Sequence, residues 1–398
     1  MIIRAMTTQF ATGFGSGEGA ASTAAESALA DLDGEADFVV VFCSSSYDYD
    51  KVVETVRAQT GEASLIGAST AGEFTDEQAG EGGIVVTAIA SDEMTFYTGI
   101  GHGLSDDLHG AVEEAAAQIP DEQADHPHRV GINLHDGLTG RGEEIAMLAY
   151  QQFPIPFSGG SAGDDIALEE TFVFHNDQVA TDSIVLAVIG SEKPFALGVE
   201  HGHEPVSEPL TVTDADGSLV HELDGRPAFE AFADAISDVA RERYGINPHD
   251  VEAESEEFVE LLTTFQLGIK SGGDNYKVRW AGPTPNTDGP MAFATTIPEG
   301  TELTVMDSSR DNQIEAARQS AVNTHEAMGG AELAGALVFD CACQGAILGE
   351  RFGESVEVMN TELGVPLAGF QTYGEICMQE GEMRGYHNTT SSVLGFPE

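Results

Sequence analysis

An internal repeat constrains the fold of this chain more than any other feature of the sequence. Each copy has a short apolar, strand-like run, a polar loop, a helix-like stretch, a second apolar run and a glycine turn. The copies lie at residues 38–90, 130–190 and 336–396. Their turns read GASTAGE at 67–73, GGSAGDD at 159–165 and GFQTYGE at 369–375, and an apolar hairpin pattern follows each turn. The repeat therefore predicts strand–helix–strand–hairpin units.

The spacing inside the copies supports this interpretation. We take the first strands to end at equivalent residues, which are Cys43, His135 and Cys341. The glycine that opens the turn follows 24 residues later in the first two copies and 28 residues later in the third. Two strands joined through a helix pair in parallel, whereas hairpin strands pair antiparallel. We expect an α/β fold with mixed sheets flanked by helices.

The length of 398 residues favours two domains, because one domain commonly takes roughly 100–200 residues. We expect one domain at 36–215 and a second at 216–398, with an N-terminal strand or flexible segment at 1–35. A block of different character, at 205–306, separates the second copy of the repeat from the third.

The charge of the chain is strongly negative. There are 68 acidic and 16 basic residues, so the formal net charge is −52. Such a surface argues against a nucleic-acid groove and against an anionic membrane surface. The carboxylates are spread along the chain and lysine occurs only four times, which suits a salt-rich cytoplasm that screens self-repulsion. We interpret the charge as a halophile-type adaptation; the alternative is an acidic face for a basic partner.

Compartment and redox state follow from what the sequence contains. No apolar run approaches the ~20 residues of a membrane span, and the first residues have no signal-peptide core. Four cysteines are too few for a disulfide scaffold in a chain of this length. We expect a soluble, cytoplasmic protein in a reducing environment.

The motifs in both halves of the chain resemble those of the FIST family, whose halves are the FIST N and FIST C domains. The first half contains IGASTAGEF, FSGGSAGDD and VEHGHEPV, and the second contains VHELDGRPAFEAF, IPEGTELTVM, LVFDCACQG and PLAGFQTYGEI. Three positions depart from the family pattern. Cys343 and Gln344 stand where a glycine and an arginine are usual, and His203 stands where a tryptophan is usual.

The resemblance implies a sensory protein that binds a small ligand, with amino acids as the proposed ligand class. It would signal through a partner protein such as a kinase or a chemotaxis receptor. Some relatives bind haem and sense nitric oxide, so a haem sensor is an alternative, with His135, His201 and His203 as candidate axial ligands. A third hypothesis is an enzyme with Cys341 as nucleophile and His135 as base. Walker A and G-x-S-x-G signatures are absent from the sequence, so we expect no catalysis, no metal and no cofactor.

Glycine turns and strand ends are the features that can form a ligand site. Small residues let a backbone approach a ligand, and strand ends are where α/β folds place their sites. Arg279 would hold a carboxylate and Glu375 an ammonium group, whereas the structural alternative is an ion pair for Arg279 and local capping for the turn carboxylates. The candidate ligand-binding residues are Cys43, Ser69, Thr70, Glu73, His135, Arg279, Cys341, Tyr373 and Glu375.

Overall fold

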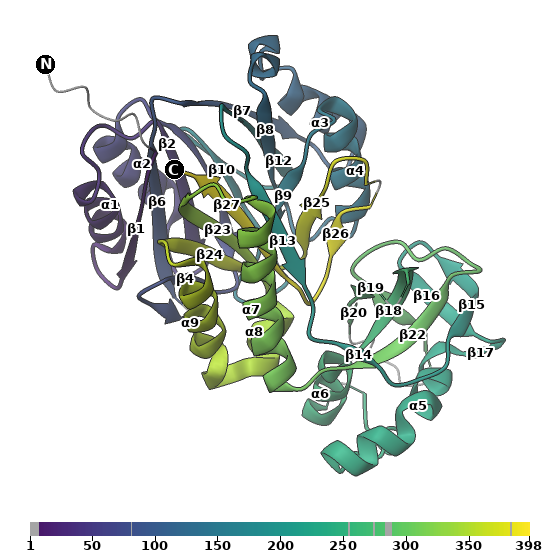
Figure 1. Cartoon of the computed structure of the whole chain (residues 1–398). Coiled ribbons are helices and arrows are strands. Elements are labelled where there is room, and N and C mark those ends of the chain that lie inside the picture. The colour runs from purple at the N-terminus through teal and green to yellow at the C-terminus, as the bar shows by residue number, and fades with distance from the viewer. Residues whose placement is uncertain (1–7, 81, 254, 274, 283–288, 383) are drawn as a thin grey trace, which may run out of the picture.

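The computed structural model describes residues 8–80, 82–253, 255–273, 275–282, 289–382 and 384–398. Within them the chain builds the same series of elements three times, and a separate domain is inserted into the third series (Figure 1). This arrangement confirms the predicted α/β fold with mixed sheets flanked by helices.

The first unit begins earlier than the repeat in the sequence indicates. Part of the segment at 1–35, where we expected a strand or a flexible arm, forms the first strand and helix of this unit. Its elements are β1 (Gln9–Ser16), α1 (Ala20–Ala30), β2 (Phe38–Ser44), α2 (Tyr49–Thr60), β3 (Ser64–Thr70), β4 (Glu73–Thr75), β5 (Ala79–Gly80) and β6 (Gly83–Ala90).

The second unit repeats this order, with a 3₁₀ turn before its second strand. Its elements are β7 (Met94–His102), α3 (Leu108–Ala116), the turn at Asp121–Asp125, β8 (His128–His135), α4 (Gly142–Gln152), β9 (Phe157–Ser161), β10 (Val173–His175), β11 (Gln178–Ala180) and β12 (Ser183–Ser191).

The third unit has the same plan, except that its crossover helix is broken in two. Its elements are β13 (Ala196–Glu200), α7 (Arg310–Ala327), β23 (Leu333–Cys341), α8 (Ala342–Leu348), a 3₁₀ turn (Gly349–Arg351), α9 (Phe352–Leu363), β24 (Leu367–Thr372), β25 (Glu375–Met378), β26 (Tyr386–His387) and β27 (Ser391–Pro397).

Local sequence accounts for the helix boundaries in each unit. The α2 helix begins after Asp48, whose carboxylate accepts a hydrogen bond from the backbone N–H of Lys51, and it ends at Gly61 with φ 62°. In the same way α7 begins after Ser309, whose hydroxyl accepts from the backbone N–H of Asn312. The strand between α1 and α2 is apolar and fully buried, as expected for a central strand covered on both faces.

Each unit lends its hairpin to the sheet of another unit, and the exchange is cyclic. The three sheets have the strand orders β1-β6-β2-β3-β10-β11, β7-β12-β8-β9-β25-β26 and β13-β27-β23-β24-β4-β5. Thus the β10–β11 hairpin of the second unit completes the first sheet, the third unit completes the second sheet, and the first unit completes the third. The three units cannot therefore fold as separate domains, because each sheet needs strands from two of them.

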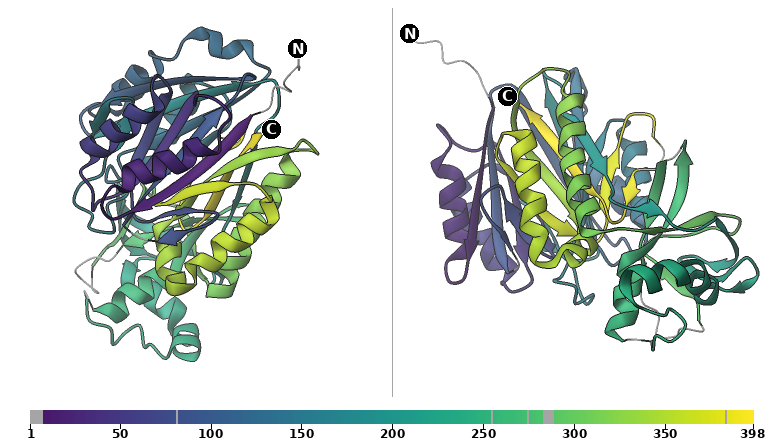
Figure 2. Two further views of the ribbon diagram at one scale, coloured as in Figure 1. Left: turned by 90° about the vertical axis from the view of Figure 1, so that its left-hand side faces the viewer. Right: turned by 60° about the horizontal axis from the view of Figure 1, so that its bottom comes forward.

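The inner faces of the three sheets meet in one hydrophobic core. Phe42 of the first sheet packs against Phe339 and Phe370 of the third, with ring centroids 6.2 and 4.4 Å apart, and the second sheet contributes Ile132 and Leu134 to the same core. The outer face of each sheet packs against its own helices, so the helices form the outside of this body (Figure 2).

The inserted domain lies between β13 and α7 and has a core of its own, built around Phe232, Phe258 and Phe265. It projects from one end of the three-sheet body (Figures 1 and 2). Its elements are β14 (Glu204–Pro205), β15 (Leu210–Asp216), β16 (Leu219–Leu223), β17 (Arg226–Pro227), α5 (Ala228–Val239), a π-helical turn (Ala240–Tyr244), α6 (Glu256–Thr264), β18 (Phe265–Gly272), β19 (Asn275–Arg279), β20 (Ala281–Gly282), β21 (Met291–Phe293) and β22 (Glu302–Asp307).

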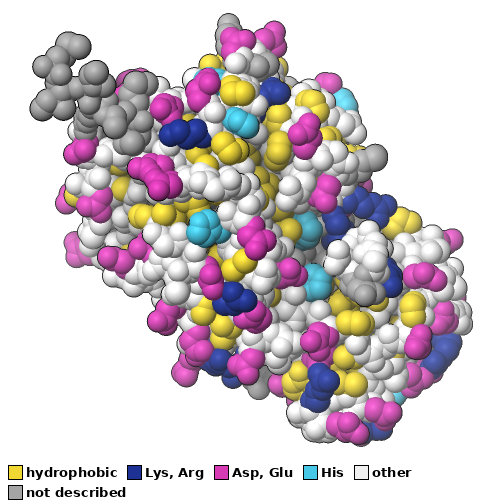
Figure 3. Space-filling model, in the orientation of Figure 1, with side chains coloured by type: hydrophobic (Ala, Val, Ile, Leu, Met, Phe, Trp, Pro, Cys, Tyr) yellow, Lys and Arg dark blue, Asp and Glu magenta, His cyan; other side chains and the backbone are white. Residues whose placement is uncertain are grey.

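Acidic side chains are scattered over the visible face of both parts (Figure 3). Among the described residues, no helix is both long and apolar enough to cross a membrane.

Candidate functional site

The glycine turns of the three units meet at the centre of the body. The turn of the first unit bonds to that of the third, because the N–H of Ala71 donates to the carbonyl of Gln371 at 3.0 Å. The second and third turns meet where the N–H of Ser161 donates to the carbonyl of Gly374 at 2.8 Å. The turns therefore form one junction, and the strand ends that we selected from the sequence lie around it.

The sheet registers correct our alignment of the strand ends. Cys43 lies opposite Ser69 and Ile84, and His135 lies opposite Ser161 and Ile184. In the third sheet the residue in this position is Asp340, opposite Gln371 and Ser391, and Cys341 comes one position later. Side chains alternate between the two faces of a strand, so Asp340, not Cys341, is the equivalent of Cys43 and His135.

The turn of the second unit also differs from our alignment. Glu73 lies opposite Phe370 and Glu375 lies opposite Gly160, and the residue in the same place in the first sheet is Val173, opposite Ala68. The carboxylates of GGSAGDD are therefore not equivalent to Glu73 and Glu375. They belong to a longer loop at 162–172, which connects β9 to β10.

Four predicted site residues form one group beside the first turn. The Thr70 hydroxyl donates a hydrogen bond to one carboxylate oxygen of Glu73. The other carboxylate oxygen of Glu73 accepts a hydrogen bond from the N–H of Gly83 at 2.9 Å. Ser69 donates to the carbonyl of Gly163 at 2.7 Å. Cys43, the fourth member, is fully buried, and this burial raises the pKa of its thiol, with a smaller contribution from the negative charge of Glu73. These contacts stabilise the turn and leave Cys43 an unreactive thiol at neutral pH.

A second group surrounds Tyr386 on the hairpin of the third unit. The Tyr386 hydroxyl lies 3.1 Å from Ser161 Oγ, which in turn lies 2.8 Å from Nε2 of His135. The other ring nitrogen of His135 lies 3.1 Å from the Asn133 side-chain oxygen. The His135 ring is completely buried, and desolvation lowers its pKa to about 4, so the ring is neutral at neutral pH.

Glu375 and Cys341 belong to the interior of this second group. Glu375 accepts hydrogen bonds from the hydroxyl of Thr372 at 2.7 Å and from the hydroxyl of Thr390 at 2.8 Å. Burial raises the pKa of Glu375 well above its usual range, and the neighbouring Cys341 raises it further. Burial also raises the pKa of the Cys341 thiol. Asp340, next to Cys341, is buried as well, and desolvation raises its pKa to about 8.

Tyr373 connects the third turn to the loop of the second unit. Its hydroxyl donates to the Asp164 carboxylate, which also accepts from the backbone N–H groups of Leu168, Glu169 and Glu170. Tyr373, a candidate ligand-binding residue, thus holds a loop in place through its hydroxyl.

Arg279 lies on β19 of the inserted domain and is 3 % exposed. Its guanidinium donates to the Glu143 carboxylate of α4 at 2.9 Å and to the carbonyl of Tyr386 at 2.9 Å. Desolvation lowers the pKa of Arg279 and the charge of Glu143 opposes that shift. The carboxylate that Arg279 binds in the structure is therefore one from the body of the same chain.

The histidines considered as haem ligands lie near the inserted domain or in the core. His201 Nε2 lies 3.0 Å from the carbonyl of Tyr276, and His203 is buried, with desolvation lowering its pKa to about 3. Among the described residues, no group of three or more histidine, cysteine, aspartate or glutamate side chains is arranged to hold a metal ion.

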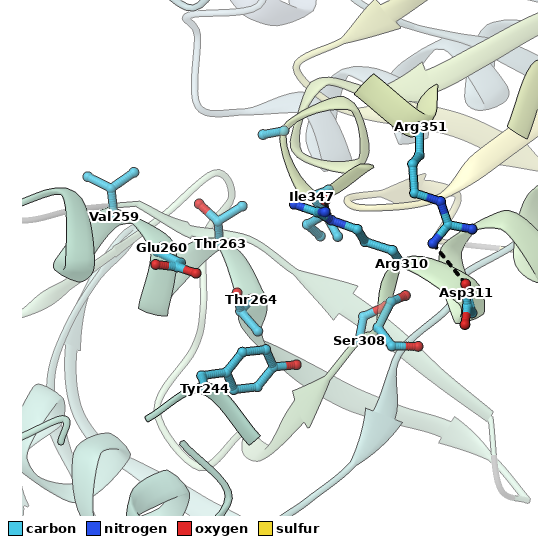
Figure 4. A pocket seen from close by; sticks show the side chains of 12 residues that line it. Tyr244, Val259, Glu260, Thr263, Thr264, Ser308, Arg310, Asp311, Ile347 and Arg351 are labelled. Atoms are coloured by element: carbon cyan, nitrogen blue, oxygen red, sulfur yellow. Dashed lines mark hydrogen bonds and ion pairs between the residues drawn. The ribbon is translucent and has the colours of Figure 1, made fainter. Parts of the chain in front are cut away.

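A pocket that the sequence did not indicate separates the inserted domain from the body (Figure 4). It has a volume of about 890 Å³. One wall comes from the inserted domain, through Tyr244, Val259, Glu260, Thr263 and Thr264. The opposite wall comes from the start of α7 with the two residues before it, from α8 and from the 3₁₀ turn after α8, through Ser308, Ser309, Arg310, Asp311, Ala346, Ile347 and Arg351.

Two arginines at this pocket differ in their partners. Arg351 is paired with Asp311 at 2.9 Å and with Glu354 at 2.9 Å. Arg310 uses only its Nε, which donates to the carbonyl of Ile347 at 2.9 Å, and it forms no ion pair with a described residue. Figure 4 shows its side chain extending along the pocket wall. Basic residues are scarce in this chain, so each arginine was worth considering as a ligand-binding residue. Arg310 was missed because it stands among polar residues at a helix start, as many surface arginines do.

The fold and this geometry define a two-part α/β protein with a buried, turn-rich centre and an open interdomain pocket. The FIST N domain model matches residues 37–226 and the FIST C domain model matches residues 228–378. The chain belongs to the FIST family, whose domains are generally sensory, ligand-binding signalling domains.

Curated relatives are identical to this chain at about a quarter of the aligned positions. An uncharacterized protein of Methanocaldococcus jannaschii, MJ1623, is 25% identical over 218 residues, which are 51% of this chain and 41% of the relative. An uncharacterized protein of Mycobacterium bovis, Mb0898c, is 25% identical over 57% of this chain and 56% of its own length. An uncharacterized Mycobacterium tuberculosis protein, Rv0628c, is 26% identical over 57% of both chains. The chain thus spans about half the length of the curated relatives it matches.

Among solved structures, a cyanuric acid hydrolase from A. caulinodans aligns with this chain over nearly its whole length. The TM-score is 0.31 with 8% sequence identity, over 98% of this chain and 100% of the hydrolase.

Proposed function

We propose that the chain is a non-enzymatic sensor that binds a small ligand of the amino-acid class in the interdomain pocket and signals through a partner protein. The observation that carries the proposal is Arg310. It faces a pocket of about 890 Å³ without an acidic partner among the described residues, in a chain with 68 carboxylate side chains. A guanidinium fork in a pocket is suited to a carboxylate of a ligand.

The other groups that line the pocket fit the rest of an amino acid. Glu260 is exposed on the opposite wall and forms no ion pair with a described residue, so its carboxylate is available to an ammonium group. The hydroxyls of Thr263 and Thr264 can supply hydrogen bonds, while Val259 and Ile347 supply apolar surface. A volume of this size is in the range of small-molecule sites, roughly 300–1,000 Å³.

The position of the pocket also suits a sensor. Its walls belong to two bodies with separate hydrophobic cores, so a ligand that contacts both walls favours one arrangement of the two. That shift in population is a signal that a kinase or a chemotaxis receptor can read at the surface.

The buried thiols favour binding over cysteine-dependent catalysis. Burial raises the pKa of Cys43 and of Cys341, so neither is a thiolate at neutral pH. The His135 ring, the base of the enzyme hypothesis, is already held between Asn133 and Ser161.

Isothermal titration of the full chain with single L-amino acids in 2 M KCl tests the proposal. We expect one or a few to bind, and Arg310→Ala to weaken that binding by at least tenfold, the effect of losing a charged hydrogen bond. Arg226→Ala is the matched control, because Arg226 is an exposed, ion-paired arginine of the inserted domain outside the pocket lining. The proposal fails if no amino acid binds, or if Arg310→Ala binds like the wild type.

A further inference from the structure

The second unit carries an extra loop that the fold itself does not require. Between β9 and β10 the chain uses the eleven residues 162–172, whereas the equivalent connections in the other units are the two-residue turns 71–72 and 373–374. Because two residues are enough to join the same strands in the same geometry, the additional length serves something other than the sheet.

The backbone of this loop is held in an unfavourable conformation. Asp165, Ile166 and Leu168 have φ values of 54°, 66° and 56°, in the left-handed region that a β-branched residue rarely adopts. Such strain persists only where the surroundings fix it, and it concentrates at functional sites.

Hydrogen bonds within the loop and to the first unit hold the loop in this conformation. Asp164 accepts hydrogen bonds from the N–H groups of Leu168 and Glu170 at 2.9 and 3.0 Å. Asp165 accepts from the hydroxyl of Ser44 and from the N–H of Ser45, each at 2.9 Å. The loop is therefore anchored to the first unit as well as to its own.

This anchored loop exposes two large apolar side chains. Ile166 is 56% exposed and Leu168 is 54% exposed, the two highest values among the large apolar residues that the structure describes. A rigid segment that keeps such side chains in water loses hydrophobic stabilisation, which a bound partner would restore.

Ile166 also borders a pocket of about 460 Å³ that continues this apolar surface. The pocket is lined by Ala79, Ala346, Phe352, Gln371 and four glycines, so little side-chain bulk blocks it. Among the described residues that line it, Glu350 is the one that carries a charge. Ala346 of α8 also lines the interdomain pocket, so a single short helix separates the two pockets.

The charges around the loop restrict the kind of partner. Glu169 and Glu170 are exposed on the loop and Glu350 is exposed at the pocket, whereas neither the loop nor the described part of the pocket lining contains lysine or arginine. We propose that the 162–172 loop and the adjoining pocket form a docking surface for a partner protein segment that inserts an apolar side chain flanked by lysine or arginine residues. A second copy of this chain, with its net charge of −52, is the less suitable occupant.

Fluorescence anisotropy with defined peptides tests this docking surface on the full chain in 0.5 M KCl. The probe is labelled Lys-Lys-Ser-Leu-Phe-Ser-Lys-Lys, compared with a peptide in which Ser-Ser replaces Leu-Phe and one in which glutamate replaces every lysine. We expect the apolar basic peptide to bind at least tenfold more tightly than either comparison peptide. In the Ile166→Ser/Leu168→Ser variant this difference should fall below threefold.

The Leu219→Ser variant is the matched control, because it removes an exposed apolar side chain of the inserted domain that lines neither pocket, and it should bind like the wild type. Circular dichroism melting of both variants should match the wild type, since all three side chains lie at the surface. Equal binding of all peptides, or loop variants that bind like the wild type, would overturn the proposal. So would a wild-type dimer in sedimentation that the loop variant lacks, because the occupant would then be a second copy.

This docking surface does not depend on the amino-acid ligand. Peptide binding with no amino-acid binding would support the surface and reject the ligand proposal. The reverse result would reject the surface alone.

Discussion

Arg279 and Glu143 form an ion pair that fastens the inserted domain to the body. The guanidinium and carboxylate are 2.9 Å apart, and their side chains are 3 % and 20 % exposed. The arginine comes from β19 and the glutamate from α4. The pair therefore bridges two bodies with separate hydrophobic cores.

Replacing one partner of this ion pair should lower the free energy of unfolding more than replacing both partners. We expect Arg279→Met to lower the free energy of unfolding by about 3 kcal/mol, because it leaves the Glu143 carboxylate partly buried without its cation. The double variant Arg279→Met/Glu143→Leu should recover most of the loss, since two apolar side chains can replace a buried ion pair at little cost. Chemical denaturation in 2 M KCl measures both values. Equal losses in the single and the double variants would contradict this account.

Asp340 should make stability fall as the pH rises. Its pKa is raised to about 8 in the folded protein, so above the unfolded value near 4 the unfolded chain releases a proton that the folded chain keeps. Between about pH 4 and pH 8 this residue should therefore lower the free energy of unfolding, with a slope of up to about 1.4 kcal/mol per pH unit.

Asp340→Asn should remove this contribution, because an amide does not titrate. We expect its melting temperature to exceed that of the wild type increasingly from pH 5 to pH 8, as measured by differential scanning fluorimetry. Parallel curves for the two proteins across this range would show that Asp340 does not titrate as described.

The cysteines should differ sharply in reactivity. Cys43, Cys341 and Cys377 are buried, and Cys343 is the partly exposed one. Burial raises the pKa of all three buried thiols, to about 12 for Cys377. Intact-mass analysis after iodoacetamide at pH 7.5 should show one modification on the folded chain, at Cys343, and four after denaturation. Rapid labelling of Cys341 in the folded protein would instead revive the cysteine-dependent enzyme.

Salt should stabilise the fold. With a net charge of −52, carboxylate repulsion is screened only when the Debye length is short, about 4 Å near 0.5 M salt. We expect the melting temperature to rise steadily from 0.1 to 2 M KCl. An unchanged melting temperature over this range would contradict the halophile-type interpretation of the charge.

The sequence alone determined the repeated unit. Its apolar runs, helix-like stretches and glycine turns are local patterns, and residues 38–90, 130–190 and 336–396 contain the expected order of elements. It also determined the family, because several motifs stand in the right order in both halves. These features depend on neighbouring residues, so periodicity and turn chemistry are sufficient to find them.

Only the tertiary structure decided how the units combine. The exchange of hairpins between sheets depends on contacts between residues far apart in the chain, such as Glu73 opposite Phe370. Strand register made Asp340 the equivalent of Cys43, and a shift of one residue reverses the face on which a side chain lies. The partner of Arg279 and the isolation of Arg310 follow from where the inserted domain sits on the body. In the sequence Arg279 stands between Val278 and Trp280 and Arg310 stands among polar residues, but neither pattern specifies which carboxylate lies within reach of a guanidinium after folding.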